Sequence, residues 1–208
     1  MQLRSNDLID QQPIDPRFAF GKLDPHEPMA LSDNMSPHLA WADAPDGTQS
    51  FVILCIDPDV PSEADDVNQT GKTISPDLPR VDFCHWAMID IPSEVHELTT
   101  GQCSDGVTVG GKQNPPGPAN VRQGLNDYTS FMAGSDLEGK YYGYDGPCPP
   151  WNDERLHRYV FTVFALDQAR LDLPEGFSGH DVVRSIDGHV LAQASLTVTY
   201  TLNPDVAN

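Results

Sequence analysis

The sequence predicts a mainly β protein, built as a sandwich or a barrel-like fold with little helix. Three observations indicate this class. Apolar runs are short and bounded by turn residues, one segment alternates apolar and polar residues at period two, and helical periodicity appears in one place only. The alternation of strands and helices that a Rossmann sheet requires is absent. With 208 residues the chain is long enough for one sizeable domain, so we expect residues 1–208 to form a single domain.

The first predicted strands lie in the N-terminal third of the chain. Residues 15–23, "DPRFAFGKL", are apolar at Phe18 and Phe20 and indicate an edge strand. Residues 50–57, "SFVILCID", indicate a buried strand that stops at Pro58.

A second buried strand is predicted over residues 83–91, "FCHWAMIDI", and it ends at Pro92. By simple alternation, Trp86 and Met88 point to one side of this strand. The other face is expected to carry His85 together with three apolar residues, Ala87, Ile89 and Ile91.

The third predicted strand, residues 157–166, has a face that changes from polar to apolar along its length. His157 and Tyr159 begin this face, and three apolar residues continue it, Phe161, Val163 and Ala165. This gradient is expected of a strand that runs from the rim of a pocket into a core. Arg158 points the other way, so we expect it to be a structural or surface charge.

The C-terminal region supplies the last two elements. Residues 194–202, "ASLTVTYTL", alternate cleanly and predict a strand. Residues 178–190, "SGHDVVRSIDGHV", predict a short helix that stops at Gly188, with an apolar stripe of Val182, Val183, Ile186 and Val190. Residues 101–150 hold 10 of the 16 glycines and 6 of the 19 prolines, which indicates loops rather than a second core.

The charge balance limits the partners of the protein. Twelve Lys and Arg residues stand against 31 Asp and Glu residues, a net charge of −19, and such a surface repels nucleic acid and anionic bilayers. The longest unbroken apolar run, 51–56, is too short for a transmembrane helix, and the N-terminus lacks the apolar stretch of a secretory signal. We therefore expect a cytoplasmic protein without nucleic-acid binding or stable membrane insertion.

The cysteines give no metal-binding pattern. Cys55, Cys84, Cys103 and Cys148 are spread along the chain and form no CxxC pair. They are therefore predicted to be free thiols, as is usual inside cells.

Four polar residues lie where the predicted strands begin or end: Asp57, His85, His157 and Tyr159. Taken alone, an aspartate beside a proline is typical of a turn, and a histidine on an apolar face is usually a core residue. Taken together, the four predict a small polar cup if the strand ends converge. Imidazole and phenol groups donate hydrogen bonds, so the cup suits a phosphate monoester or diester. Asp57 would orient a histidine or bind an ammonium group.

A proline-rich loop is predicted to form a rigid wall for this cup. In "GPCPP", residues 146–150, Gly146 allows a close approach of the backbone. The prolines hold the shape of the loop, because each has a fixed φ.

Four motifs occur in an order that points to a known family: "DPDVPS" (57–62), "HWAMIDIP" (85–92), "YYGYDGPCPP" (141–150) and "HRYVFTVFALD" (157–167). With them, the chain resembles the phosphatidylethanolamine-binding protein family, and most closely its bacterial and archaeal Raf-kinase-inhibitor-like branch. "SDNMSPHLAW" (32–41) is similar to the opening motif of that branch. The chain departs from the family in the long acidic segment 62–82.

The resemblance implies two antiparallel sheets with a few short helices and an anion-binding pocket. It places Asp57, His85, His157 and Tyr159 in that pocket, and it implies a lining that includes Pro61, Gly146, Pro149 and Pro150. Members of the family bind phosphate-bearing small molecules, including phospholipid head groups. We therefore expect a non-enzymatic binding protein that needs no cofactor or metal and forms a homodimer.

Two other classes of function stay open at this point. A hydrolase could use Cys148 and His157 as a thiolate–imidazole pair, or could hold a metal ion with Asp57, His85 and His157. A protease or kinase inhibitor could act through the loops of residues 101–150. The binding hypothesis predicts that His157→Ala abolishes binding of a phosphate ester and leaves the fold intact.

Overall fold

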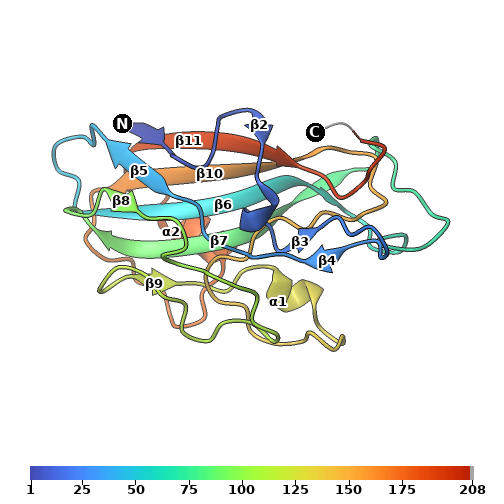
Figure 1. Cartoon of the computed structure of the whole chain (residues 1–208). Coiled ribbons are helices and arrows are strands. Elements are labelled where there is room, and N and C mark those ends of the chain that lie inside the picture. The colour runs from blue at the N-terminus through green and yellow to red at the C-terminus, as the bar shows by residue number, and fades with distance from the viewer. Residues whose placement is uncertain (207–208) are drawn as a thin grey trace.

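A six-stranded sheet forms the centre of the computed structural model, which describes residues 1–206 (Figure 1). Across the sheet its strands are β2 (Gln12–Pro13), β11 (Val190–Tyr200), β10 (His157–Leu166), β6 (Ser50–Pro61), β7 (Arg80–Pro92) and β9 (Arg122–Gln123). Neighbouring strands are antiparallel, except that β2 and β11 are parallel.

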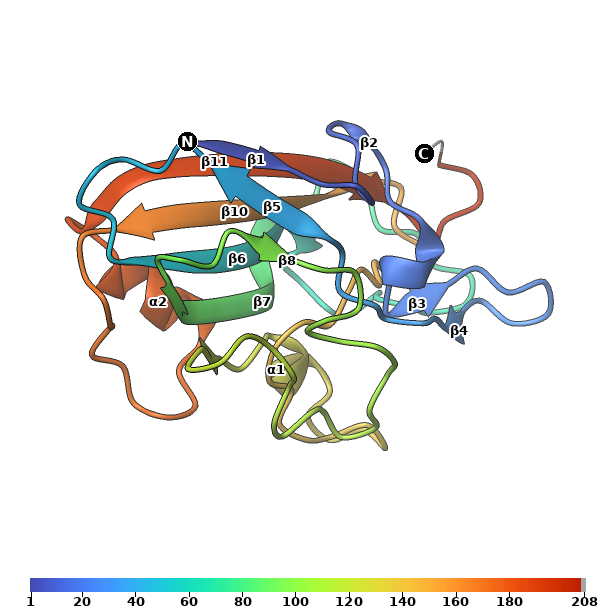
Figure 2. The ribbon, with the colours of Figure 1, turned by 60° about the vertical axis from the view of Figure 1, so that its left-hand side comes forward.

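Smaller elements cover this sheet. A three-stranded antiparallel sheet consists of β1 (Gln2–Arg4), β5 (Leu39–Ala42) and β8 (Glu97–Leu98), and β3 (Gly21–Lys22) pairs with β4 (Ala30–Leu31). The helices are η1 (Pro16–Phe18), α1 (Tyr128–Phe131) and α2 (Gly179–Ser185). Figure 2 shows β1, β5 and β8 in front of the large sheet and α2 behind it. The predicted mainly β fold with few short helices is confirmed.

The middle of the large sheet is buried on both faces, which explains why the first part of β6 is continuously apolar. Phe51, Ile53 and Cys55 join the core that lies beneath the three-stranded sheet. Val52 and Leu54 point the other way, into a second core that α2 closes. The apolar side chains of residues 51–55 therefore leave water, at about 1.5–3 kcal/mol of stabilisation for a large one.

Of the predicted strands, the third, over residues 157–166, agrees most closely with the structure. β10 spans His157–Leu166, as expected, and the face that begins with His157 and Tyr159 is fully buried. Arg158 lies on the opposite side, half exposed, and forms an ion pair with Asp59. Its predicted role as a structural or surface charge is confirmed.

The predicted end of β6 at Pro58 is wrong, because the strand continues to Pro61. The pairing with β7 shifts between Asp57 and Val60, so Pro58 and Asp59 form a bulge. A bulge leaves Pro58 outside the regular ladder, where its missing N–H costs no hydrogen bond.

The ends of the chain differ more from prediction. Residues 15–23 form η1 and the two-residue strand β3 instead of one edge strand, because Pro16 and the capping side chain of Asp15 favour a helical turn. β11 begins four residues before the predicted Ala194, in a half that is largely exposed and has no apolar alternation to mark it.

Helix α2 is shorter than the helix predicted over residues 178–190. Val182 and Ile186 are buried, as expected, whereas Val183 and Val190 are exposed. Gly188 follows the helix with φ 77°, a conformation that favours glycine and stops the helix as predicted.

Strand β7 does not alternate simply, so the predicted faces of this strand are partly wrong. Its register shifts at two places, which leaves His85 without a partner on β6 and gives Asp90 a φ of 59°. As a result, Ile91 joins Trp86 and Met88 in the first core. His85 leaves the side of Ala87 and packs against Tyr159, with ring centroids 5.1 Å apart.

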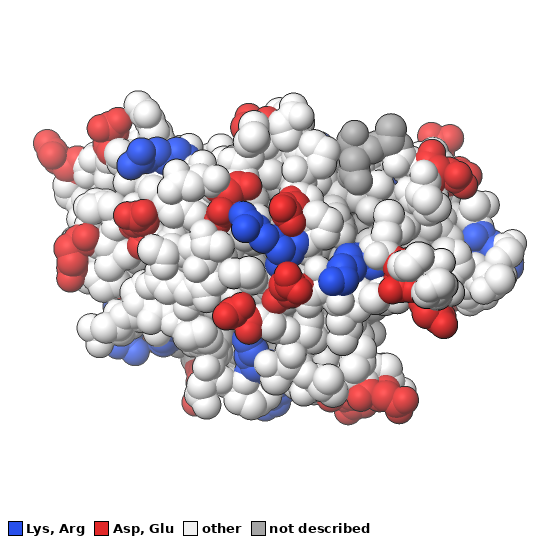
Figure 3. All heavy atoms as spheres, in the orientation of Figure 1, with Lys and Arg blue, Asp and Glu red and all other residues white. Residues whose placement is uncertain are grey.

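All four cysteines are free, as predicted. Within residues 1–206, no helix has the length and apolar character needed to cross a membrane. On the face shown in Figure 3, acidic side chains occur from one end of the molecule to the other, with basic side chains between them.

Candidate functional site

A cavity of about 100 Å³ lies at the end of the large sheet where β6 ends and β7 and β10 begin. Asp57, His85, His157 and Tyr159 all line it. The structure therefore brings together the four polar residues that the sequence singles out, and we call them the polar floor. Asp57 lies directly before the bulge of β6, and His85 lies at a register shift of β7 and has no partner on β6. His157 and Tyr159 lie at the beginning of β10.

His157 contacts a carboxylate through each of its ring nitrogens. Its Nδ1 lies 2.7 Å from Oδ2 of Asp57, and its Nε2 lies 3.1 Å from Oδ2 of Asp153. The ring is completely buried. With a carboxylate at each nitrogen, the stable form is the imidazolium, which donates both N–H groups.

The protonation of His157 follows from these two neighbours. Burial alone would lower its pKa, but the charge of Asp57 and the hydrogen bonds to Asp153 and Asp57 outweigh burial and raise the pKa to about 9. Asp153 also accepts two hydrogen bonds from the guanidinium of Arg80. Burial opposes ionisation of Asp153, yet the hydrogen bonds from His157 and Arg80 lower its pKa.

His85 is held differently and keeps one nitrogen free. Its Nδ1 lies 2.9 Å from the carbonyl oxygen of Asp145, which makes Nδ1 the N–H donor. The rings of Phe83, Tyr128 and Tyr159 enclose the imidazole, with centroids 4.8, 5.5 and 5.1 Å away. Within residues 1–206, Nε2 has no hydrogen-bond partner. Burial lowers the pKa of His85, so the neutral ring turns an acceptor lone pair toward the cavity.

A buried network fixes the carbonyl group that orients His85. The carboxylate of Asp145 accepts hydrogen bonds from Lys112 at 2.6 Å and from Asn34 and Asn126 at 2.8 Å each. The backbone N–H of Asp145 also donates to the carbonyl oxygen of His85. The position of the imidazole therefore depends on side chains that do not touch the cavity.

Tyr159 supplies a hydroxyl group without a partner. The residue is completely buried and lines the cavity, and its oxygen makes no hydrogen bond within the described part of the chain. Burial, and after it the charge of Asp57, raises the pKa of the phenol, so it stays an O–H donor at neutral pH. A buried hydroxyl without a partner costs roughly 1–3 kcal/mol, a cost that a ligand in the cavity would remove.

The proline residues lie where the family resemblance implies, and Gly146 does not. Pro61, Pro149 and Pro150 line the cavity. Gly146 is buried behind the wall, where a Cβ atom would collide with the carbonyl oxygen of Phe18. Its own carbonyl accepts the hydroxyl of Tyr128 at 2.8 Å, so it positions a lining residue instead of lining the cavity.

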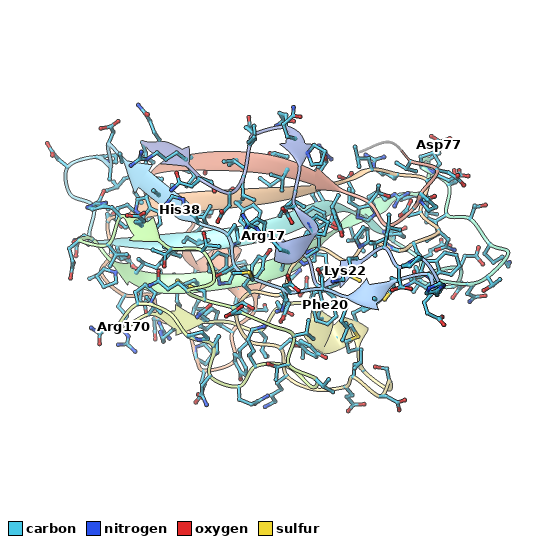
Figure 4. All side chains as sticks on the ribbon, in the orientation of Figure 1. Arg17, Phe20, Lys22, His38, Asp77 and Arg170 are labelled. Carbon is cyan, nitrogen blue, oxygen red and sulfur yellow. The ribbon has the colours of Figure 1, made fainter. Side chains whose placement is uncertain are left out.

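Sequence reasoning missed the apolar residues that complete the cavity. Val60, Ala64, Val67 and Asn68 come from the bulged end of β6 and the acidic segment; Phe83, Tyr128 and Phe131 come from β7 and α1. Figure 4 shows Phe20 beside α1, where its ring stacks on that of Tyr128 at 4.8 Å. Phe83 begins the strand predicted over residues 83–91, but the others lie at the bulged end of β6, in a loop or in the four-residue helix α1, where no periodic pattern marks them.

The alternatives of hydrolysis and metal binding find little support in the geometry. Cys148 lines the cavity, but burial raises the pKa of its thiol to about 12, which leaves almost no thiolate. Both nitrogens of His157 already contact carboxylates, so this ring cannot serve the thiol as a base. Residues 1–206 contain no group of three His, Cys, Asp or Glu side chains arranged to hold a metal ion.

Comparison with known proteins gives consistent matches. The family model described as phosphatidylethanolamine-binding protein matches residues 4–201. The UPF0098 protein YbhB of Escherichia coli is 36% identical over 201 residues, which cover 97% of this chain and all of that protein. A UPF0098 protein of Aquifex aeolicus is 36% identical over 167 residues, 80% of this chain and 74% of that protein.

Two solved structures share the fold. The crystal structure of E. coli YbcL, described as a new member of the mammalian PEBP family, superposes with a TM-score of 0.67 at 26% identity, covering 96% of this chain and 97% of that one. The structure of the homologue CT736 from Chlamydia trachomatis gives a TM-score of 0.64 at 26% identity, over 96% and 95% of the two chains.

Proposed function

The chain belongs to the phosphatidylethanolamine-binding protein family, and from this premise we propose that it is a non-enzymatic binding protein for small phosphate-bearing ligands. The single observation that carries the proposal is the buried hydroxyl of Tyr159, a residue of the cavity lining, which has no hydrogen-bond partner within residues 1–206. Together with Nε2 of His85, it offers the hydrogen bonds that a phosphate group would complete.

The roles within the polar floor differ from those expected from sequence. His157 donates both N–H groups to carboxylates, so it does not reach the ligand as a donor. It holds Asp57 in place instead. Tyr159 and His85 are therefore the residues that contact the phosphate, and Asp57 is the acceptor beside it.

The walls suit the part of the ligand that adjoins the phosphate. Four apolar residues line the cavity beside the polar floor: Val60, Val67, Phe83 and Phe131. The side chain of Phe131 is half exposed, so a bound molecule would cover it. A compact polar head with a small apolar group next to it fits this division, and the free phosphate monoester of a phospholipid head group is one such ligand.

Isothermal titration calorimetry with inorganic phosphate and with phosphoethanolamine at pH 6.5 tests the proposal. We expect both ligands to bind, and we expect Tyr159→Phe to weaken both by roughly 10- to 100-fold, the effect of one hydrogen bond to a charged group. Tyr142→Phe is the matched control, because Tyr142 lies outside the cavity. If neither ligand binds, or if both tyrosine variants bind like the wild type, the proposed function is wrong.

A further inference from the structure

We propose that the cavity selects phosphate monoesters that carry one proton, and that it excludes phosphodiesters and sulfate. This inference rests on the proposed function and specifies its ligand. The evidence is the balance of donors, acceptors and charges on the polar floor.

Asp57 has room for one more donor, and only for a donor. Its Oδ2 is 2.7 Å from Nδ1 of His157, and its Oδ1 accepts the backbone N–H of Asp59, also at 2.7 Å. A carboxylate has about four acceptor sites, so each oxygen can accept again. Because Asp57 lines the cavity, the group placed against it must bring a hydrogen atom.

The polar floor has no surplus of positive charge. Asp57, His157, Asp153 and Arg80 alternate in sign along one chain of contacts, so their charges cancel. Asp59 with its two arginines lies outside the lining of the cavity.

The other lining groups are neutral as well. Tyr128, Tyr159 and Cys148 stay protonated, because burial raises the pKa of each. The lining residues of the acidic segment, Ala64, Val67 and Asn68, have no charge. Behind His85, Asp145 is paired with Lys112, and Asp127 adds a further negative charge near the ring.

A dianionic group would therefore lie against an oxygen of the Asp57 carboxylate with no surplus positive charge on the polar floor to offset the repulsion between them. One proton between the two oxygens converts this repulsion into a short, charge-assisted hydrogen bond. A phosphate monoester has a second pKa near 6 and can bring that proton. A phosphodiester and sulfate have no such O–H group.

The protons of the complex can be followed atom by atom. The ligand's P–O–H group donates to Asp57, and the hydroxyl of Tyr159 donates to a second phosphate oxygen. Nε2 of His85 takes one proton from solvent and donates to a third oxygen. From the dianion and neutral His85, binding takes up two protons, one on the phosphate and one on the imidazole.

The experiment compares ligands that differ only in this proton. Calorimetry on the wild-type protein uses methyl phosphate against dimethyl phosphate, and phosphate against sulfate, between pH 6.0 and 8.5. We expect dimethyl phosphate and sulfate to bind roughly 10- to 100-fold more weakly at pH 6.5. The affinity for methyl phosphate should fall about tenfold per pH unit for each proton taken up.

Repeating the titrations at pH 8 in two buffers with different enthalpies of ionisation counts the protons directly. His85→Gln should reduce the uptake by one proton, because an amide donates without being protonated.

Phosphoethanolamine and glycerophosphoethanolamine then distinguish the two sources of phosphate, since the first is a free monoester and the second has the diester of an intact phospholipid.

The outcomes separate the two proposals. If monoesters and diesters bind equally and no protons are taken up, this inference is wrong while the proposed function stands. If none of the probes binds, both are wrong. Preference for the monoester together with proton uptake supports both.

Discussion

The imidazole of His157 bridges Asp57 and Asp153, with its two nitrogens 2.7 and 3.1 Å from the carboxylate oxygens. All three residues are buried, and Arg80 completes the chain of alternating charges. The bridge connects the polar floor of the cavity to the segment that precedes β10. It makes His157 a structural residue whose role in binding is indirect.

This arrangement changes the expectation that His157→Ala would leave the fold intact. Removing the imidazolium leaves two buried carboxylates beside each other, and breaking a buried ion pair costs about 3–5 kcal/mol. We expect the free energy of unfolding, measured by urea denaturation at pH 7, to fall by that amount. His26→Ala is the control, because His26 is exposed and its side chain makes no hydrogen bond within residues 1–206. A loss below about 1 kcal/mol would contradict the bridge.

The raised pKa of His157 also predicts how stability depends on pH. The group titrates near 6.5 in the unfolded chain and near 9 in the folded protein. Its contribution is fully present below pH 6.5 and is lost as the pH rises through 9, at most on the order of 3 kcal/mol. Melting temperatures between pH 6 and 9.5 should fall for the wild type and change less for His157→Gln. Parallel curves would show that another group is responsible.

The sequence revealed the strands best where apolar side chains face both cores. β10 was predicted to the residue, because its buried face is continuous from His157 to Ala165. The bulges of β7 could not be predicted, since a shift of register depends on the partner strand and not on the pattern within one strand. For that reason the side on which His85 lies was predicted wrongly, although its place at the cavity was correct.

The candidate site was predictable as a group of polar residues but not as a set of interactions. Asp153 gave no signal, because it lies in a loop and its role depends on Arg80, 73 positions away in the sequence. The unpartnered state of Tyr159 is likewise visible only in three dimensions. The acidic segment contributes Ala64, Val67 and Asn68 to the wall, and no periodicity marked them.

The network behind His85 gives a third prediction. In Asp145→Asn, the new NH2 group lies against the side-chain amides of Asn34 and Asn126, which donated hydrogen bonds to the carboxylate. The ammonium of Lys112 also loses its ion-pair partner, although the side chain of Lys112 is only 10% exposed. We expect a loss of roughly 2–4 kcal/mol in urea denaturation, the range for a hydrogen-bonded charge left unpaired.

The variant Asp145→Asn should also weaken phosphate binding, because His85 is oriented by the carbonyl of Asp145. Lys112→Met separates the two effects, since it removes the buried charge and keeps the bonds of Asp145 to Asn34 and Asn126. Equal phosphate affinity in the wild type and in both variants would show that the network does not position the imidazole.

The acidic segment that forms one wall of the cavity is held in place mainly by one side chain, Asn152. Its amide nitrogen donates to the carbonyl oxygens of Asp66 and Lys72, at 2.8 and 3.1 Å, and its Oδ1 accepts the N–H of Asn68 at 2.9 Å. Asn152 is buried, so these bonds are shielded from water. Within residues 62–72, Oδ1 of Asn68 also accepts the backbone N–H of Trp151 at 3.0 Å, one bond beside the several that Asn152 makes.

We therefore expect Asn152→Ala to loosen this wall and to leave the large sheet intact. Amide hydrogen exchange, read by mass spectrometry, should become at least about tenfold faster in residues 62–72, because losing hydrogen bonds of about 1 kcal/mol each lowers the cost of local opening. Exchange in β6 and β10 should not change. Asp77→Ala is the matched control, since Asp77 lies at the outer end of the same segment, as Figure 4 shows, and its carboxylate makes no hydrogen bond within residues 1–206. Faster exchange throughout the sheet, or equal exchange in both variants, would show that Asn152 does not fasten the wall.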